Sequence, residues 1–248
     1  MYGWRARIGI IIPSVNTTFE PECQRLAPEG VSFHFSRMSL GDLTIEGLRE
    51  MGKHSIEKGK ELASAGVDLI VFGCTSGSFS EGTGHDEKII RELEEATGIP
   101  ALATSTAVIK ALKTLSVRSF ALCSPYSEEL NAREKEFFEA QGFKVTAMVG
   151  LGLVKKTPLF PLASRPVSHV GLQEFYVPYK LARMVNSPEA QAIFISCTNF
   201  ATLAKIEALE KEIGKPVITA NQATFWAALR KMGVKDQWTG SGRLFRDF

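Results

Sequence analysis

Residues 67–79, VDLIVFGCTSGSF, join a continuous apolar run to a loop of small residues, and residues 190–202, AQAIFISCTNFAT, repeat this arrangement later in the chain. Short continuous apolar runs indicate strands of a parallel sheet that is covered by helices on both faces. In such sheets, ligands bind outside the carboxyl ends of the strands. We therefore expect Cys74 and Cys197, which follow the two runs, to lie at strand ends near a ligand.

The likeness between the two stretches extends along the chain in both directions. Residues 96–112, ATGIPALATSTAVIKAL, correspond to residues 212–229, EIGKPVITANQATFWAAL. Residues 7–16, RIGIIIPSVN, correspond to residues 119–128, SFALCSPYSE. This repeat predicts two copies of one α/β unit, related by an approximate twofold axis, with equivalent strand ends facing one cleft. Any two strand-loop-helix units look somewhat alike, but the shared Cys-Thr pairs favour a true repeat.

Apolar runs alternate with segments of helical periodicity over the whole chain, which is typical of α/β proteins. Glycine follows most of the helical segments, where a residue with positive φ commonly ends a helix. These glycines are Gly66, Gly98, Gly142, Gly214 and Gly233. We predict strands at residues 8–12, 69–72, 101–103, 120–123, 193–196 and 217–219, and helices at residues 44–65, 87–97, 105–115, 127–141, 173–186, 200–213 and 222–232.

The composition excludes several classes of protein. The chain has 248 residues, of which 44% are hydrophobic, so it can fill a large core. Its 29 basic and 27 acidic residues are scattered, without the basic stripe that follows a nucleic-acid backbone. No apolar run approaches the roughly 20 residues that cross a bilayer, and no signal peptide is recognisable. We expect a cytoplasmic protein without nucleic-acid or membrane partners.

Motifs that would hold a metal or an organic cofactor are missing from the sequence. The four cysteines form neither a CxxC pair nor a Cys/His cluster, which argues against a zinc site, a disulfide scaffold and a thioredoxin-type centre. No glycine-rich nucleotide fingerprint follows a strand. Cys23 and Cys123 lack the strand-end loop setting, so we expect both to be structural. The same holds for the histidines, which have no ligand spacing: His34, His54, His85 and His169.

The loop after Cys74 has the groups expected of a carboxylate site. The N–H groups of Thr75, Ser76 and Gly77 can bind an anion, and their positive end favours a thiolate over a thiol. This predicts an unusually acidic Cys74 thiol. Cys197 has the same setting. One such cysteine alone is more often a small buried hydrophobic residue, but two at matching positions favour a catalytic pair.

Two further loops follow the first predicted strand of each half. The PSVNTT loop, residues 13–18, supplies hydroxyls, an amide and backbone N–H groups; a simple turn with a helix cap is the alternative. We expect Asn16, with Pro13 and Ser14 beside it, to bind the ligand. Tyr126 occupies the matching loop, where its hydroxyl can bind a carboxylate, although packing alone would explain it nearly as well.

Taken together, these segments resemble the Asp/Glu racemase superfamily, particularly its branch that contains maleate cis-trans isomerase and arylmalonate decarboxylase. The resemblance covers nearly the whole chain and rests on PSVNTT, GCTSGS, ATSTAVIKAL, SPYSEELN, SCTNF and GSGRLF. It implies two flavodoxin-like subdomains with the active site between them and no cofactor. We place the first subdomain at residues 1–104 plus 222–248 and the second at residues 105–221, and expect a homo-oligomer.

The resemblance also implies roles for individual residues. Maleate isomerases of this branch have both cysteines, whereas arylmalonate decarboxylase has a glycine at the position of Cys74. On this basis we expect a cofactor-independent isomerase of a small dicarboxylic acid, with Cys74 as nucleophile and Cys197 as acid and base. The expected substrate-binding residues are Pro13, Ser14, Asn16, Thr75, Ser76, Tyr126, Thr198 and Asn199.

One segment departs from the isomerase pattern. Isomerases carry an asparagine in the loop after the second strand of the second half, whereas residues 151–171 of this chain are longer, Pro-rich and basic. Lys155, Lys156, Arg165 and His169 in this segment either cover the site and contact a different acid or form a solvated surface loop. Three alternatives therefore stay open: a decarboxylase, a racemase, and a non-catalytic protein that binds a small acid.

Overall fold

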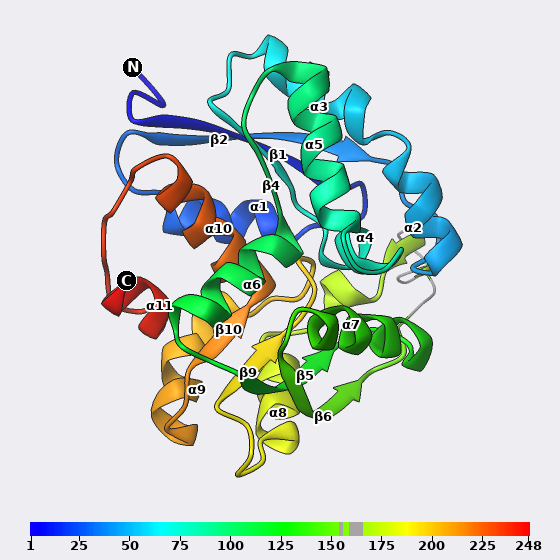
Figure 1. The fold of residues 1–248 in the computed structure, drawn as a ribbon, viewed down its shortest axis with the longest axis vertical. Coiled ribbons are helices and arrows are strands. Elements are labelled where there is room, and N and C mark those ends of the chain that lie inside the picture. The colour runs from blue at the N-terminus through cyan, green and yellow to red at the C-terminus, as the bar shows by residue number, and fades with distance from the viewer. Residues whose placement is uncertain (154–155, 159–165) are drawn as a thin grey trace.

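The computed structural model describes residues 1–153, 156–158 and 166–248, which form two four-stranded parallel sheets surrounded by helices (Figure 1). The first sheet has the strand order β2-β1-β3-β4 and the second has the order β10-β9-β5-β6. The first sheet contains β1 (Ala6–Pro13), β2 (Val31–Met38), β3 (Leu69–Phe72) and β4 (Ala101–Ala103). The second contains β5 (Ser119–Ser124), β6 (Lys144–Gly150), β9 (Ala192–Ile195) and β10 (Val217–Thr219), and a separate antiparallel pair is made by β7 (Lys156–Pro158) and β8 (Pro166–Ser168).

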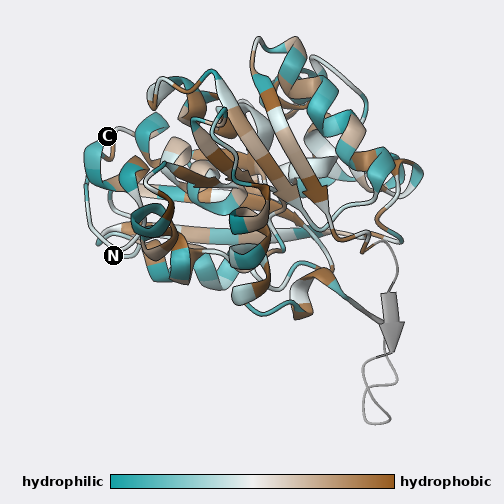
Figure 2. Ribbon diagram, turned by 90° about the horizontal axis from the view of Figure 1, so that it is seen from below, coloured by the Kyte–Doolittle hydropathy of each residue, from teal (hydrophilic) through white to brown (hydrophobic). Residues whose placement is uncertain are grey.

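The two parallel sheets repeat one topology. Read in reverse, the second sheet has the order β6-β5-β9-β10, so that β1 corresponds to β5, β2 to β6, β3 to β9 and β4 to β10. The inner strands β3 and β9 are buried at every residue, as their continuous apolar sequences require. Figure 2 shows hydrophobic residues concentrated on the inner strands, with hydrophilic residues on the outward helix faces. The predicted α/β class with two similar halves is confirmed.

The helices occupy the connections between parallel strands. Helices α6 and α10 pack against each other in the middle of the molecule, where each leaves the last strand of its own sheet (Figure 1). Gly66, Gly98, Gly142, Gly214 and Gly233 all have positive φ, as predicted from their positions after helices. The helices are α1 (Phe19–Leu26), α2 (Ile45–Gly52), α3 (Ser55–Ser64), α4 (Thr75–Phe79), α5 (His85–Thr97), α6 (Thr104–Thr114), α7 (Glu128–Ala140), α8 (Tyr176–Val185), α9 (Ile206–Ile213), α10 (Ala220–Lys231) and α11 (Arg243–Asp247), with 3₁₀ turns η1 (Val170–Leu172) and η2 (Leu203–Lys205).

The structure differs from the sequence-based prediction in two edge strands and in the bounds of two helices. The sequence-based prediction missed β2 and β6, which lie at sheet edges and mix buried with exposed residues, because an edge strand needs no continuous apolar run. The helix predicted at residues 44–65 is divided into α2 and α3 near Gly52, a residue of low helix propensity. The helix predicted at residues 200–213 begins only at Ile206, after the turn η2.

A buried carboxylate joins the two halves beside the cleft. Glu22, on α1 of the first half, accepts hydrogen bonds at Oε1 from the backbone N–H groups of Thr202 (2.7 Å) and Leu203 (2.9 Å). Its Oε2 accepts a third from Asn221 Nδ2 at 2.7 Å. A carboxylate that receives three hydrogen bonds is well placed at the start of η2, where backbone N–H groups lack partners. Glu22 therefore fixes the end of the Cys197 loop against the first half.

Among the described residues, no helix is long and apolar enough to span a membrane.

Candidate active site

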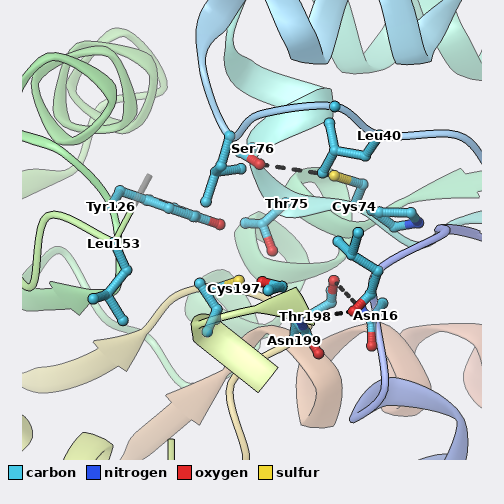
Figure 3. Close-up of a pocket in the computed structure, with 16 residues that line it drawn as sticks. Asn16, Leu40, Cys74, Thr75, Ser76, Tyr126, Leu153, Cys197, Thr198 and Asn199 are labelled. Atoms are coloured by element: carbon cyan, nitrogen blue, oxygen red, sulfur yellow. Dashed lines mark hydrogen bonds between the residues drawn. The ribbon is translucent and has the colours of Figure 1, made fainter. Parts of the chain in front are cut away.

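A pocket lies between the two halves at the carboxyl ends of β1, β3, β5 and β9 (Figure 3). Each of these strands delivers residues to it, as expected for open α/β sheets. Both Cys74 and Cys197 line this pocket, and neither forms a disulfide. The pocket brings together all but one of the predicted site residues: Pro13, Asn16, Cys74, Thr75, Ser76, Tyr126, Cys197, Thr198 and Asn199.

Cys74 is the N-cap residue of α4. Its Sγ accepts a hydrogen bond from the backbone N–H of Gly77 at 3.3 Å and lies 3.7 Å from Ser76 Oγ. Burial nevertheless raises the pKa of the Cys74 thiol, although the Gly77 N–H and the Ser76 hydroxyl oppose the shift. The prediction of an unusually acidic Cys74 thiol is therefore wrong, because the sequence could not show that the side chain is only 3% exposed.

Cys197 has a different backbone from its counterpart. Its φ is +92°, in the left-handed region, whereas Cys74 has an extended backbone with φ −140°. A side chain other than glycine at positive φ costs about 1–3 kcal/mol and is characteristic of functional sites. Burial raises the pKa of the Cys197 thiol to about 12, so this cysteine is protonated at neutral pH.

Two buried hydroxyls of the pocket have no hydrogen-bond partner among the described residues, those of Thr75 and Tyr126. The loop around Tyr126 is fixed, because its N–H donates to Ser124 Oγ at 3.0 Å and its carbonyl accepts from Asn131 Nδ2 at 3.3 Å. Figure 3 shows the Tyr126 side chain crossing the pocket towards Thr75 and Cys197. Unpaired buried hydroxyls cost about 1–3 kcal/mol each, so a ligand that accepts hydrogen bonds from both is strongly favoured.

The amide of Asn16 connects the halves. Its Nδ2 donates to Thr198 Oγ1 at 3.0 Å, and Thr198 Oγ1 donates to the carbonyl of Gly73 at 3.1 Å. Its Oδ1 accepts from the backbone N–H groups of Thr18 (3.0 Å) and Phe19 (2.9 Å). One Nδ2 hydrogen of Asn16 is left for a ligand, since the amide nitrogen has two.

Asn199 makes a second connection in the same place. Its Oδ1 accepts from the Thr17 N–H at 2.9 Å, and its Nδ2 donates to the carbonyl of Val15 at 3.2 Å. The side-chain amides of Asn16 and Asn199 therefore hold the loop after β1 in the first half against the loop after Cys197 in the second half.

Ser14 is the one predicted binding residue outside the pocket. It is exposed, and its hydroxyl accepts a hydrogen bond from the Leu40 N–H at 3.1 Å. The sequence-based prediction also missed one wall of the pocket, which is mainly apolar. If β2 had been predicted, residues 40–43 would have been recognised as the loop at its carboxyl end. The other residues of this wall have side chains without catalytic or charged groups, so their types did not point to a ligand site. The lining residues that the prediction did not name are Val15, Leu40, Gly41, Leu43, Leu153, Ser168 and Val170. Of these, Val15 lies in the predicted PSVNTT loop, and Leu153, Ser168 and Val170 belong to the segment 151–171, for which covering the site was one of the two alternatives.

The remaining cysteines and histidines lie elsewhere. Cys23 is buried in α1 and Cys123 in β5, and neither lines the pocket. Within the described part of the chain, no group of three His, Cys, Asp or Glu side chains could hold a metal ion. His169 lies next to the pocket residues Ser168 and Val170. Of the other basic residues proposed to contact the substrate, Lys155, Arg165 and the side chain of Lys156 lie outside the described residues.

The fold and the pocket define a class: a two-lobed α/β enzyme in which each lobe contributes one cysteine to the pocket between them. The chain belongs to the arylmalonate decarboxylase family, since the sequence model of that family matches residues 8–245. The resemblance predicted from the sequence motifs is thereby confirmed.

The chain is similar over nearly its whole length to two curated relatives and to one solved structure. It is 27% identical to the maleate isomerase of Geobacillus stearothermophilus over an alignment of 252 positions, which covers 96% of each chain. It is 28% identical to the arylmalonate decarboxylase of Bordetella bronchiseptica over 239 residues, covering 96% of this chain and 95% of that one. A Nocardia farcinica maleate cis-trans isomerase, a cysteine-to-serine variant with a covalently bound succinylcysteine intermediate, matches with a TM-score of 0.89 and 25% identity over 98% of this chain and 99% of that one.

Proposed function

We propose that this protein is a cofactor-independent isomerase of a small dicarboxylic acid, similar to maleate cis-trans isomerase, with Cys74 as nucleophile and Cys197 as acid and base. The observation that carries the proposal is the joint presence, in one pocket, of a thiol from each half and two buried hydroxyls without partners. Thiols can add to an activated double bond and transfer a proton, and the hydroxyls can hold a carboxylate.

The reaction begins with Cys74 as thiolate and Cys197 as thiol. The Cys74 sulfur adds to one carbon of the double bond, and the displaced electron pair moves to the other carbon, next to a carboxylate. Cys197 then donates its proton to that carbon, giving a succinyl thioether on Cys74. The former double bond is now single and can rotate.

The second half of the reaction reverses these bonds. The Cys197 thiolate removes a proton from the same carbon, the double bond forms again in the trans geometry, and the bond to Cys74 breaks. Both cysteines return to their starting protonation states. The covalently bound succinylcysteine of the Nocardia farcinica isomerase variant supports a covalent adduct on a cysteine in this reaction.

The different environments of the thiols support the different roles. Burial raises the pKa of both thiols. At Cys74 the hydrogen bond from the Gly77 N–H opposes this rise, whereas the pKa of Cys197 reaches about 12, so that Cys197 holds its proton. The hydroxyls of Thr75 and Tyr126 would bind the substrate carboxylate and the negative charge that develops on it. One such preorganised donor contributes roughly 3 kcal/mol to transition-state stabilisation.

The apolar wall favours a second candidate, a decarboxylase or racemase that acts on an acid with an apolar substituent. Leu40, Leu43, Leu153 and Val170 line the pocket and could hold such a group. In this case a cysteine would only deliver or remove a proton. A binding protein without turnover is the weaker alternative, since binding alone needs no thiol.

Incubation with a panel of cis-enedioates, malonates and amino acids in D₂O, followed by product NMR, separates these functions. We expect maleate to be converted to the trans isomer. Failure to convert any enedioate, with release of CO₂ from a malonate or proton exchange in an amino acid, would instead establish the second candidate. The assigned residue roles, the subdomain boundaries at residues 104/105 and 221/222, the cytoplasmic location and the homo-oligomeric state remain predictions.

A further inference from the structure

The loop after Cys197 forms few hydrogen bonds of its own. Among the described residues, one backbone bond lies within residues 197–203, from the Phe200 N–H to the carbonyl of Cys197 at 3.3 Å. In the same part of the chain, neither Thr202 before η2 nor Lys205 before α9 caps its helix with a side-chain hydrogen bond. Buried backbone N–H groups need partners, so this loop depends on groups outside it.

The first half of the molecule supplies these partners. At the end of the loop, Glu22 Oε1 accepts from the N–H groups of Thr202 and Leu203 at 2.7 and 2.9 Å. At its start, the carbonyl of Asn199 accepts from Thr18 Oγ1 at 3.2 Å. Glu22 therefore acts as the helix cap that the local sequence lacks, although it lies about 180 residues earlier in the chain.

The carboxylate is itself held firmly in place. Glu22 is 9% exposed, and α1, which carries it, packs beside α10 (Figure 1). Its second oxygen accepts from Asn221 Nδ2, in the first turn of α10, at 2.7 Å. Both carboxylate oxygens are thus engaged, so the side chain cannot turn away from the loop without leaving buried donors unpaired.

Cys197 is the residue that needs such support. Its φ of +92° is unfavourable for a side chain other than glycine and persists only where the surrounding structure imposes it. At the matching place in the first half, Cys74 has an extended backbone and caps α4 itself, through the Gly77 N–H at 3.3 Å. The loop that has the unfavourable backbone is therefore the one that is capped from the other half.

We propose that Glu22 is a positioning residue for Cys197: by holding the end of the loop on the first half, it maintains the left-handed backbone of Cys197 and so places the thiol for proton transfer. Glu22 is not among the described residues that line the pocket, and it acts only through the loop. The inference rests on the proposed function for the use of the Cys197 thiol, whereas the effect on the backbone is independent of any substrate.

Thermal unfolding tests the effect on the backbone without a ligand. In an otherwise unmutated chain, Cys197→Gly should melt about 2–4 °C above Cys197→Ala, because glycine tolerates positive φ. In a Glu22→Ala background the loop is released, and this difference should shrink to less than about 1 °C. Glu22→Asp, whose shorter side chain cannot reach both N–H groups, is the milder variant and should act in the same direction should Glu22→Ala fail to fold.

Glu210 provides a matched control. It is also a buried carboxylate, 4% exposed, and accepts two backbone N–H bonds outside the Cys197 loop, from Val217 at 2.9 Å and Arg243 at 2.8 Å. Glu210→Ala should lower the melting temperature but keep the difference between glycine and alanine at position 197. An unchanged difference in both Glu22 backgrounds, or an equal reduction in Glu210→Ala, would overturn the proposal.

Maleate turnover gives a second readout. Glu22→Ala should lower kcat up to about a hundredfold, as a misplacement of about 1 Å can do, with KM within about twofold, since the hydroxyls of Thr75 and Tyr126 are untouched. Glu22→Gln should recover most of the loss, because its amide oxygen still accepts both N–H bonds and its Nε2 can donate to the unpaired Asn221 Oδ1 once that amide turns.

Glu210→Ala should leave kcat unchanged in the same assay. A loss confined to KM in Glu22→Ala, or an equal loss of kcat in Glu210→Ala, would contradict a positioning role. Absence of maleate turnover by the unmutated protein would contradict the proposed function alone, because the unfolding measurements decide the role of Glu22 independently.

Discussion

The two cysteine loops begin alike and end differently. After β3, Cys74 has an extended backbone and caps α4 at once, so that a backbone N–H points at its sulfur. After β9, Cys197 has φ +92°, and η2 begins only at Leu203. The intervening residues serve to connect the halves, through Thr198, Asn199 and the Thr202 N–H. A repeated strand-end cysteine thus became a candidate nucleophile in one half and a candidate proton donor in the other, because the residues after it differ.

Exchange of each cysteine for serine should give the largest effect. Cys74→Ser should lose more than about a thousandfold in maleate turnover, as is typical when a nucleophile is removed. Cys197→Ser should lose about 10²–10⁴-fold, the range of general acid–base catalysis, and should still form an adduct on Cys74. Intact mass spectrometry with maleate checks this asymmetry. Full turnover by Cys74→Ser would contradict the isomerase mechanism.

The threonines after the two cysteines provide the next comparison. Thr75 has an unpaired hydroxyl, so Thr75→Val should keep the stability of the protein and lose about a hundredfold in turnover, like the loss of one oxyanion donor. The Thr198 hydroxyl bonds to Asn16 and Gly73. Thr198→Val should therefore reduce the free energy of unfolding by about 1–3 kcal/mol. Steady-state kinetics and urea denaturation measure the two effects, and equal behaviour of the two variants would argue against distinct roles.

Alkylation compares the four thiols directly. We expect iodoacetamide to label Cys74 about tenfold faster than the others, because the Gly77 N–H partly offsets the effect of burial on its pKa. The rate should be below that of a free cysteine at neutral pH and should rise with pH, since a raised pKa leaves little thiolate. Peptide mapping identifies the labelled residue. Faster labelling of Cys23 or Cys123, both deeply buried, would contradict this order.

The smallest effect concerns backbone strain. At position 197, glycine should be more stable than alanine by about 1 kcal/mol, because glycine adopts positive φ without strain. At position 74, where φ is −140°, the order should reverse by roughly 0.5–1 kcal/mol. Thermal unfolding of the four single variants tests this. The same order of stability at both positions would mean that the backbones differ less in solution than in the structure.

The sequence predicted the parts of the molecule that have a strong local signal. Strands β3 and β9 are continuous apolar runs, and their repeated Cys-Thr ends identified both cysteines and the pocket between the halves. The edge strands β2 and β6 escaped prediction because half-exposed strands lack such runs. With β2 missed, Leu40 and Leu43 had no place in the predicted site.

Properties that depend on tertiary packing could not be predicted. The sequence shows N–H donors after Cys74 but not the burial that raises the pKa of its thiol. Glu134 looks like any other acidic residue on a charged helix, and only the packing of α7 on the sheet shows that it is buried beside Ser196. The positive φ of Cys197 is equally invisible, because residues other than glycine rarely adopt it.

The backbone at Cys197 also has an evolutionary consequence. Cysteine and glycine codons differ by a single nucleotide, and at φ +92° the exchange relieves strain instead of creating it. Selection for catalysis and selection for folding therefore act on this position in opposite directions. In descendants released from the reaction, we expect glycine to replace Cys197 early.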